Sequence, residues 1–172
     1  MSIDLYLFKK INGLAKKSIF LDFLGVFCAQ YLGYLMIVWV FALGFLNNNW
    51  AMILVPLSTG AVAILAINEA VYFFYKRKRP IEVMQENALI AKPISPSFPS
   101  SHTSFFFAFS LALILYNLPL ALTFCVLSLL IAVSRVFCGV HWPSDILGGI
   151  ASALVSFIFL LLVFSIKIST SF

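Results

Sequence analysis

The sequence has very little charge. Of its 172 residues only 10% are Asp, Glu, Lys or Arg, whereas 63% are hydrophobic. Soluble domains are about half apolar and about a quarter charged, so this composition excludes a water-soluble globular protein. It predicts an integral membrane protein instead.

Cysteines and acidic residues are also scarce. The three cysteines, Cys28, Cys125 and Cys138, all lie in apolar stretches. An odd number of cysteines in such surroundings indicates neither a disulfide framework nor a metal site. The 11 Lys and Arg residues outnumber the six Asp and Glu residues, but they are not spread over a soluble face. Nucleic acid is therefore not expected as a partner.

Five apolar runs are candidates for membrane spans, which need about 20 mostly apolar residues. They cover residues 19–46, 50–75, 102–116, 120–137 and a last run that starts after Pro143 and ends at residue 166. Lipid tolerates no unpaired backbone, and the alternation typical of barrel strands is absent, so each run is predicted to be a helix. We expect one all-α domain over residues 1–172, a polytopic membrane helical bundle of about five spans.

Two segments outside these runs differ from the predicted spans in their sequence pattern. In residues 1–17, Ile3, Leu7, Ile11 and Leu14 recur at spacings of three and four among four lysines, which predicts an uncleaved amphipathic helix in the membrane interface. The apolar run that follows is too long for a signal peptide. Residues 76–101 form the one long break between spans, and a loop of that length is typical of a functional segment.

Both histidines lie in polar clusters just outside apolar runs. In the first cluster, Ser100 or Ser101 can cap the helix that begins near His102, and the free amides of that helix start can bind an anion. In the second cluster, Asp145 follows His141 by four residues and can reach back to its ring. An imidazole held by a carboxylate keeps one nitrogen free as a nucleophile or base.

Two arginines lie at span ends, Arg79 and Arg135. Each has a planar guanidinium group whose paired N–H donors match phosphate oxygens. Any one of these residues alone is as well explained as an interface anchor or a solvated side chain. Together, on one side of the membrane, they indicate phosphoryl transfer.

These residues make the chain resemble the type 2 phosphatidic acid phosphatase (PAP2) superfamily of membrane lipid phosphatases, which shares its site pattern with vanadium haloperoxidases. The family motifs read K-x6-R-P, P-S-G-H and S-R-x5-H-x3-D. The chain matches the end of the first motif, most of the second and the whole of the third, with Arg79, Pro80, Pro99, Ser100, His102, Ser134, Arg135, His141 and Asp145.

The sequence departs from the family at two places. Tyr72 stands where the first motif has its lysine, and Ser101 where the second has glycine. On a continued helix Lys76 lies one turn from Tyr72 and on the face of Arg79, so we expect Lys76 to replace the missing ammonium, with Lys78 as the less well-placed alternative. Ser101 restricts positive φ, but its amide can still face a phosphate.

The resemblance implies a mechanism. His141 attacks phosphorus and forms a phosphohistidine, Asp145 orients His141, and His102 protonates the departing oxygen. The phosphate oxygens are held by the remaining group, which comprises Arg79, Arg135, Lys76, Ser100 and the amide of Ser101. No metal and no cofactor are needed.

The three glutamates lie outside the family motifs. Glu82 and Glu86, in the long loop, are interpreted as solvated rather than as contacts to a head group. Glu69 lies within a predicted span, where an acid is costly, and both a structural and a substrate role stay open.

The expected substrate is a lipid phosphate. Among small bacterial members of the family, undecaprenyl diphosphate, lipid A (at its 1-position) and phosphatidylglycerol phosphate are the substrates. The short chain and compact loop suit the first two, and we place undecaprenyl diphosphate first. Five spans would put ten of the eleven Lys and Arg residues on the catalytic side, which by the positive-inside rule would be cytoplasmic. The resemblance instead implies a plasma (inner) membrane enzyme whose site faces the periplasm or exterior, and we follow it.

Two other classes of function predict a different pattern. A small transporter would need polar residues deep in several helices, whereas here the spans are strongly apolar apart from Asn68 and Glu69. A scaffold with a dead site is disfavoured by the complete set of histidines and aspartate.

Overall fold

The computed structural model of the chain describes residues 3–84 and 87–169, and over these residues it is helical, with no strand. Its elements are α1 (Ile3–Asn12), α2 (Ile19–Gln30), α3 (Leu32–Leu46), α4 (Ala51–Val62), the π-helical turn η1 (Ala63–Asn68), α5 (Glu69–Phe74), α6 (Pro80–Val83), α7 (Ser101–Ala112), the 3-10 turn η2 (Leu113–Leu115), α8 (Leu118–Phe137) and α9 (Pro143–Ser169). The prediction of an all-α membrane bundle is confirmed.

The number of spans differs from the expectation. Within the described residues three helices are long and apolar enough to cross a membrane: Ala51–Phe74, Leu118–Phe137 and Pro143–Val163. A fourth span forms if α2 and α3, which bend by 50° at Tyr31, act together. The fifth candidate is the shorter apolar helix Ser101–Leu115. At 1.5 Å per residue it is about 22 Å long, less than the roughly 30 Å hydrocarbon core. The count of five is therefore not confirmed.

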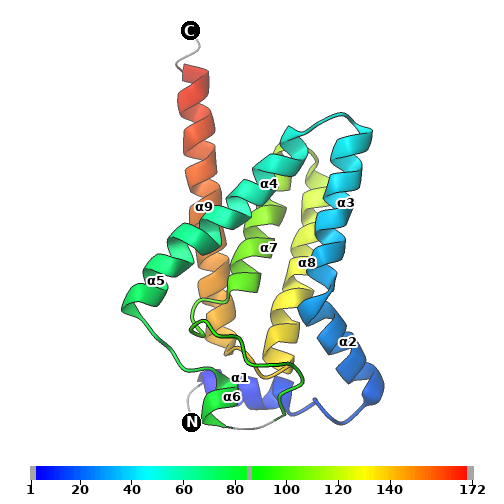
Figure 1. Cartoon of the computed structure of the whole chain (residues 1–172), viewed down its shortest axis with the longest axis vertical. Coiled ribbons are helices and arrows are strands. Elements are labelled where there is room, and N and C mark those ends of the chain that lie inside the picture. Colours follow the sequence, from blue (N-terminus) through cyan, green and yellow to red (C-terminus); the bar gives the residue numbers. More distant parts are fainter. Residues whose placement is uncertain (1–2, 85–86, 170–172) are drawn as a thin grey trace.

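The short helix α7 occupies the middle of the bundle, with α4, α8 and α9 around it (Figure 1). Its side chains Ala108, Phe109 and Ala112 are fully buried. Neighbouring helices approach closely because they present glycine: a Cβ on Gly149 would lie 2.7 Å from Cβ of Thr103. Such packing fixes the start of α7, and with it His102.

A polar pair sets the position of α5 against α7. In the π-helical turn, Asn68 is fully buried and its Nδ2 donates to Ser104 Oγ at 3.0 Å. A buried amide needs such a partner, so the pair fixes how α5 lies along α7. One turn beyond Asn68, Tyr72 therefore reaches the beginning of α7.

The chain gathers its loops at one end of the bundle, where α5 and α8 end and α7 and α9 begin. We call this the His141 end; it is at the bottom of Figure 1. The helix α1 runs across it and is anchored by Phe8, which is 1% exposed and lies 5.1 Å, centroid to centroid, from the ring of Trp142. Asn12 Nδ2 donates to the Phe137 carbonyl at 2.8 Å. The predicted helix in residues 1–17 thus covers Ile3–Asn12.

Candidate active site

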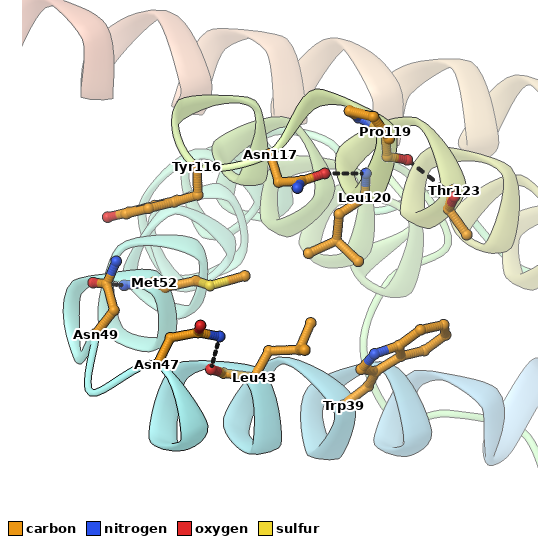
Figure 2. Close-up of a pocket in the computed structure, with 10 residues that line it drawn as sticks. All are labelled: Trp39, Leu43, Asn47, Asn49, Met52, Tyr116, Asn117, Pro119, Leu120 and Thr123. Atoms are coloured by element: carbon orange, nitrogen blue, oxygen red, sulfur yellow. Dashed lines mark hydrogen bonds between the residues drawn. The ribbon is translucent and has the colours of Figure 1, made fainter.

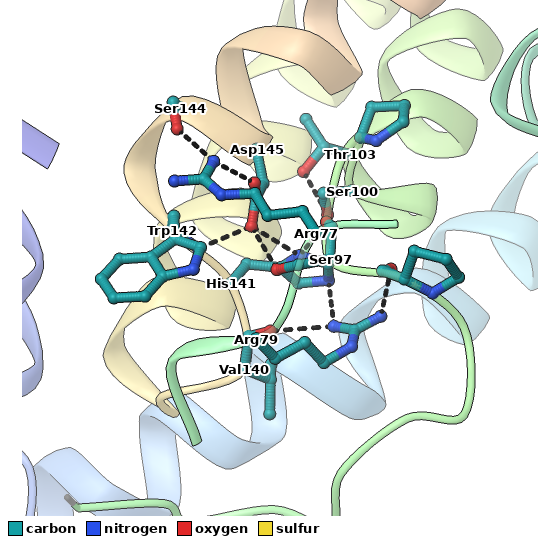
Figure 3. Close-up of polar contacts among 12 residues, drawn as sticks. Arg77, Arg79, Ser97, Ser100, Thr103, Val140, His141, Trp142, Ser144 and Asp145 are labelled. Atoms are coloured by element: carbon teal, nitrogen blue, oxygen red, sulfur yellow. Dashed lines mark hydrogen bonds and ion pairs between the residues drawn. The ribbon is translucent and has the colours of Figure 1, made fainter. Parts of the chain in front are cut away.

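His141 lies in the short connection between α8 and α9 and is 1% exposed. The chain turns at Gly139, whose φ of +81° favours glycine, and Pro143 begins α9. The ring is held from both sides: Nδ1 lies 2.9 Å from the Ser97 carbonyl oxygen, and Nε2 lies 2.9 Å from Arg79 Nη1 (Figure 3).

These two contacts define the tautomer of His141. An arginine N–H can only donate and a carbonyl can only accept. Nε2 therefore carries the lone pair, and Nδ1–H donates to the Ser97 carbonyl. Burial lowers the pKa of His141 from 6.5 to about 4, although its bond to Asp145 works in the opposite direction. At neutral pH the site thus holds a neutral imidazole with an unprotonated Nε2.

Asp145, in the first turn of α9, is fully buried and surrounded by donors. Oδ2 accepts from Ser97 Oγ at 2.5 Å and from the Trp142 amide at 2.8 Å, and Oδ1 accepts from Arg77 Nη1 at 2.7 Å. Its distance to His141 Nδ1 is longer, 3.4 Å. The geometry brings the expected pair together, but the Ser97 carbonyl is the nearer acceptor for Nδ1–H.

Arg79 is 2% exposed and is caged by loop carbonyls as well as by His141. Its guanidinium donates to the carbonyls of Val140, Ser95 and Pro96 at 2.8–3.1 Å. Burial lowers the pKa of Arg79, but arginine does not deprotonate in proteins. A full positive charge is therefore held against the unprotonated Nε2 of His141.

The N-terminus of α7 contributes the second motif. Ser100 stands at the N-cap position in an extended conformation, but its side chain makes no capping hydrogen bond; its own amide donates to the Asp145 carbonyl at 3.1 Å. Thr103 Oγ1 lies 3.0 Å from Ser100 Oγ. The first amides of a helix have no acceptor within it, so the start of α7 offers N–H groups and a partial positive charge to an anion.

His102 and Arg135 line a common hollow of about 350 Å³, together with Tyr31 and Tyr34 at the bend between α2 and α3. Arg135 is 4% exposed, and its Nη1 donates to the Ala29 carbonyl at 3.2 Å. Its Nε has no hydrogen-bond partner among the described residues. Since buried donors are normally paired, this orphaned N–H fits a site that receives an anion.

The helical basis for the expectation about Lys76 is wrong. Helix α5 ends at Phe74, because Tyr75 is extended at its C-terminal boundary, so Lys76 is not placed on a helical face with Arg79. Lys76 is exposed, and in the described part of the chain no hydrogen bond or ion pair holds it at the site. Its contact with a phosphate stays a prediction.

Of the remaining acidic residues, Glu82 has a structural place. Its carboxylate accepts from the Arg79 amide at 3.0 Å and pairs with Lys92 at 3.1 Å. The hydrogen bond from Arg79 is the main cause of a lowered pKa of Glu82. Glu69 is exposed on the outer surface of the bundle, and Glu86 lies outside the described residues.

Sequence reasoning missed Ser97, Arg77 and Asp4. Ser97 supplies both a carbonyl to His141 and a hydroxyl to Asp145, and no spacing signal distinguishes it from the other serines of the loop. Arg77 lies in a basic cluster at residues 76–79, and nothing in the local sequence distinguishes it from its neighbours Lys76 and Lys78. Within residues 3–84 and 87–169 no group of three His, Cys, Asp or Glu side chains could hold a metal ion.

Another hollow, of about 620 Å³, is at the opposite end of the bundle, between the α3–α4 and α7–α8 connections (Figure 2). Its polar side chains serve the local backbone: Asn47 donates to the Leu43 carbonyl, and Asn117 accepts from the Leu120 amide. With its polar groups used in helix capping, this hollow is not the candidate site.

The comparisons with known proteins agree with the site. The family model of the PAP2 superfamily matches residues 50–168. The chain is 30% identical over 154 residues to the undecaprenyl-diphosphatase BcrC of Bacillus subtilis, covering 87% of this chain and 78% of that protein.

Two solved structures are similar in fold. One is Aquifex aeolicus LpxE, with a TM-score of 0.71, 21% identity and coverage of 94% of this chain and 96% of that chain. The other is the PAP2 type phosphatidylglycerolphosphate phosphatase of Bacillus subtilis, with a TM-score of 0.65, 23% identity and coverage of 98% and 89%.

Proposed function

Because the chain belongs to the PAP2 superfamily and is therefore a membrane lipid phosphatase, we propose that it hydrolyses undecaprenyl diphosphate through a phosphohistidine. The observation that carries this proposal is the unprotonated Nε2 of His141, held against the cation of Arg79. The proposed nucleophile and a cation that can bind phosphate therefore lie side by side. A neutral imidazole needs no metal to act as a nucleophile at pH 7.

The first half of the reaction follows from these positions. Nε2 of His141 attacks the terminal phosphorus, the P–O bond to the leaving lipid monophosphate breaks, and His102 gives its proton to the departing oxygen. In the second half water attacks the phosphohistidine, the P–N bond breaks, and His102 takes up the proton of the water. Ser97 and Asp145 hold the imidazole in the tautomer required for attack.

Substrate binding requires Arg79 to change partners. In the free protein its Nη1 is hydrogen-bonded to Nε2 of His141, the atom that must attack phosphorus. The incoming phosphate must therefore accept this hydrogen bond in place of His141. Arg79, the orphaned Nε of Arg135, the Ser100 hydroxyl and the amide of Ser101 would then surround the equatorial oxygens. Charge spreads over these oxygens in the transition state, which is where fixed donors stabilise it most.

The choice of lipid rests on the Bacillus subtilis undecaprenyl-diphosphatase, the relative that is 30% identical over most of this chain. One fold neighbour is by its name a phosphatidylglycerolphosphate phosphatase, so that activity is one alternative. A lipid A 1-phosphatase, which the resemblance to small bacterial members of the family also implies, is the other.

We also place the protein in the plasma (inner) membrane with the His141 end facing the periplasm or exterior. The basic residues at this end would favour the cytoplasm by charge alone. Arg79, Arg135 and Arg77 are, however, held in contacts within the protein, so they do not report on the topology. Labelling of a cysteine placed at the exposed Lys10, in intact cells with a membrane-impermeant reagent, tests this orientation.

The substrate is tested by phosphate release in detergent from undecaprenyl diphosphate, phosphatidylglycerol phosphate and lipid A, with His141→Ala as the blank. The expected result is the highest kcat/KM for undecaprenyl diphosphate. A higher value for another lipid reassigns the substrate but not the chemistry. Flux of a lipid or peptide across liposomes without any phosphate release would instead indicate a transporter.

A further inference from the structure

We propose that Arg77 is a positioning residue for the catalytic carboxylate and that Asp4, on the N-terminal helix, completes the arrangement. The proposal rests on the function proposed above, because it assigns Arg77 a role through Asp145 and His141. Neither Arg77 nor Asp4 belongs to the motifs by which the chain was compared with its family.

Arg77 lies at the meeting point of three segments. Its Nη1 donates to Asp145 Oδ1 at 2.7 Å and to Ser144 Oγ at 2.6 Å, and its Nη2 pairs with Asp4 Oδ2. The guanidinium lies 5.4 Å from the ring centroid of Trp142, within the range of a cation–π contact. Arg77 therefore connects the α5–α6 segment with α1 and with the start of α9. Figure 3 shows its contacts with Ser144 and Asp145.

Asp4 binds the start of α9 from outside that helix. Its carboxylate accepts from the Ser144 amide at 2.9 Å and from Ser144 Oγ at 2.8 Å. Burial acts to raise the pKa of Asp4, but the hydrogen bonds from Ser144 and Arg77 outweigh it, and the pKa is lowered. A carboxylate at this point satisfies a first-turn amide and complements the helix dipole. Helix α1 thereby fixes the turn that carries Asp145.

The two oxygens of Asp145 have separate tasks. Oδ2 faces Ser97, the Trp142 amide and His141, whereas Oδ1 is paired with Arg77. A fully buried carboxylate is costly unless a cation and hydrogen bonds compensate for its lost hydration. Arg77 supplies that cation at Oδ1, on the side away from His141. Oδ2 can therefore stay directed toward His141 and orient its ring.

Arg77 is not placed to bind the substrate phosphate. Its donors are directed to Asp145, Ser144 and Asp4. The nucleophilic Nε2 of His141 is instead covered by Arg79. Loss of Arg77 should therefore reduce turnover and leave substrate affinity nearly unchanged.

The test measures kcat and KM for Arg77→Gln, Arg77→Lys and Asp4→Asn on the lipid diphosphate, with Lys10→Gln as the control. Lys10 is an exposed cation on the same helix as Asp4. Arg77→Gln should lower kcat by roughly 10- to 100-fold, the range for partners that orient a reacting group, with KM within about threefold. Arg77→Lys should recover part of the loss. Asp4→Asn should lower kcat less, and Lys10→Gln should match the wild type.

A double-mutant cycle separates positioning from a general structural effect. In an Asp145→Asn background, Arg77→Gln should change kcat by less than about twofold, because its partner is already altered. Independent, multiplicative losses, a wild-type kcat in Arg77→Gln, or a selective rise in KM would each overturn the proposal. If Arg77→Gln does not fold in detergent, Asp4→Asn in both backgrounds decides by the same criterion. Wild-type activity of His141→Ala would refute the proposed mechanism itself, which is a different outcome.

Discussion

The hydroxyl of Tyr72 lies 2.8 Å from the hydroxyl of Ser101 and 2.7 Å from the Pro99 carbonyl. A carbonyl only accepts, so the phenol donates to Pro99 and the serine donates to the phenol. Tyr72 and Ser101 are the two residues that depart from the family motifs, where lysine and glycine are expected. The two departures are in direct contact and form one hydrogen-bonded unit between α5 and the start of α7.

The first prediction concerns this unit. Tyr72→Phe leaves the buried Pro99 carbonyl without its donor, which should lower stability by about 1 kcal/mol and loosen the turn before His102. In a thermal-unfolding and kcat/KM comparison, Ser101→Gly should add little to Tyr72→Phe, because each removes the same pair. The Tyr72→Lys, Ser101→Gly double variant, which restores the family residues, should keep more activity than Tyr72→Lys alone. Fully additive effects would show that the two residues act independently.

The second prediction concerns the covalent intermediate. Rapid quenching into alkali during turnover of a phosphate-labelled lipid should trap label on the protein, and His141→Ala should abolish both the label and phosphate release. Asp145→Asn should fold but react orders of magnitude more slowly, because the ring loses its orientation. Label that persists in His141→Ala would assign the nucleophile to another residue.

His102 is the subject of the third prediction. His102→Ala should slow release of a lipid phosphate much more than release of an aryl phosphate, because a good leaving group needs less protonation. Parallel kcat measurements on the two substrates make the comparison. Equal losses on both would remove the general-acid assignment.

The fourth prediction follows from the protonation state of His141. Burial lowers its pKa from 6.5 to about 4, so the folded state opposes protonation. Its contribution to stability is present above pH 6.5 and is lost as the pH falls toward 4. Since the chain has two histidines, the His102→Ala variant labelled with ¹⁵N-histidine, free of any histidine tag, reports His141 alone. It should show the neutral Nδ1–H tautomer from pH 8 to about 5 and titrate near 4. An Nε2–H tautomer would contradict the contact with Arg79.

The fifth prediction is that activity survives EDTA and is inhibited by vanadate. Vanadate can take a trigonal bipyramidal geometry on His141 in place of the transition state, and transition-state mimics bind more tightly than substrates. Binding of vanadate, measured directly, should be lost in His141→Ala. A strict requirement for Mg²⁺ in phosphate release would indicate a different phosphatase chemistry.

Local properties of the chain were sufficient for the outline of this protein. Long apolar runs can only be helices in lipid, so α4, α8 and α9 were predictable from composition. The identities of His141, Asp145, Arg79 and Arg135 were predictable because their spacing is a local pattern in the sequence. The end of helix α5 before Arg79 was not predictable, since nothing in the basic cluster at residues 76–79 marks Phe74 as the last helical residue.

The tertiary structure decided the contacts between residues that are far apart in the chain. Arg77 meets Asp145 and Asp4 across 68 and 73 positions, and Tyr72 meets Ser101 across 29. A local pattern carries no record of such pairs, because they depend on how α7 is enclosed and on where α1 crosses the bundle. The sequence alone determined which groups are candidates for the chemistry, because their spacing is local. Packing at the His141 end decided that Ser97 contacts His141, that Tyr72 is joined to Ser101, and that Arg77 reaches Asp145.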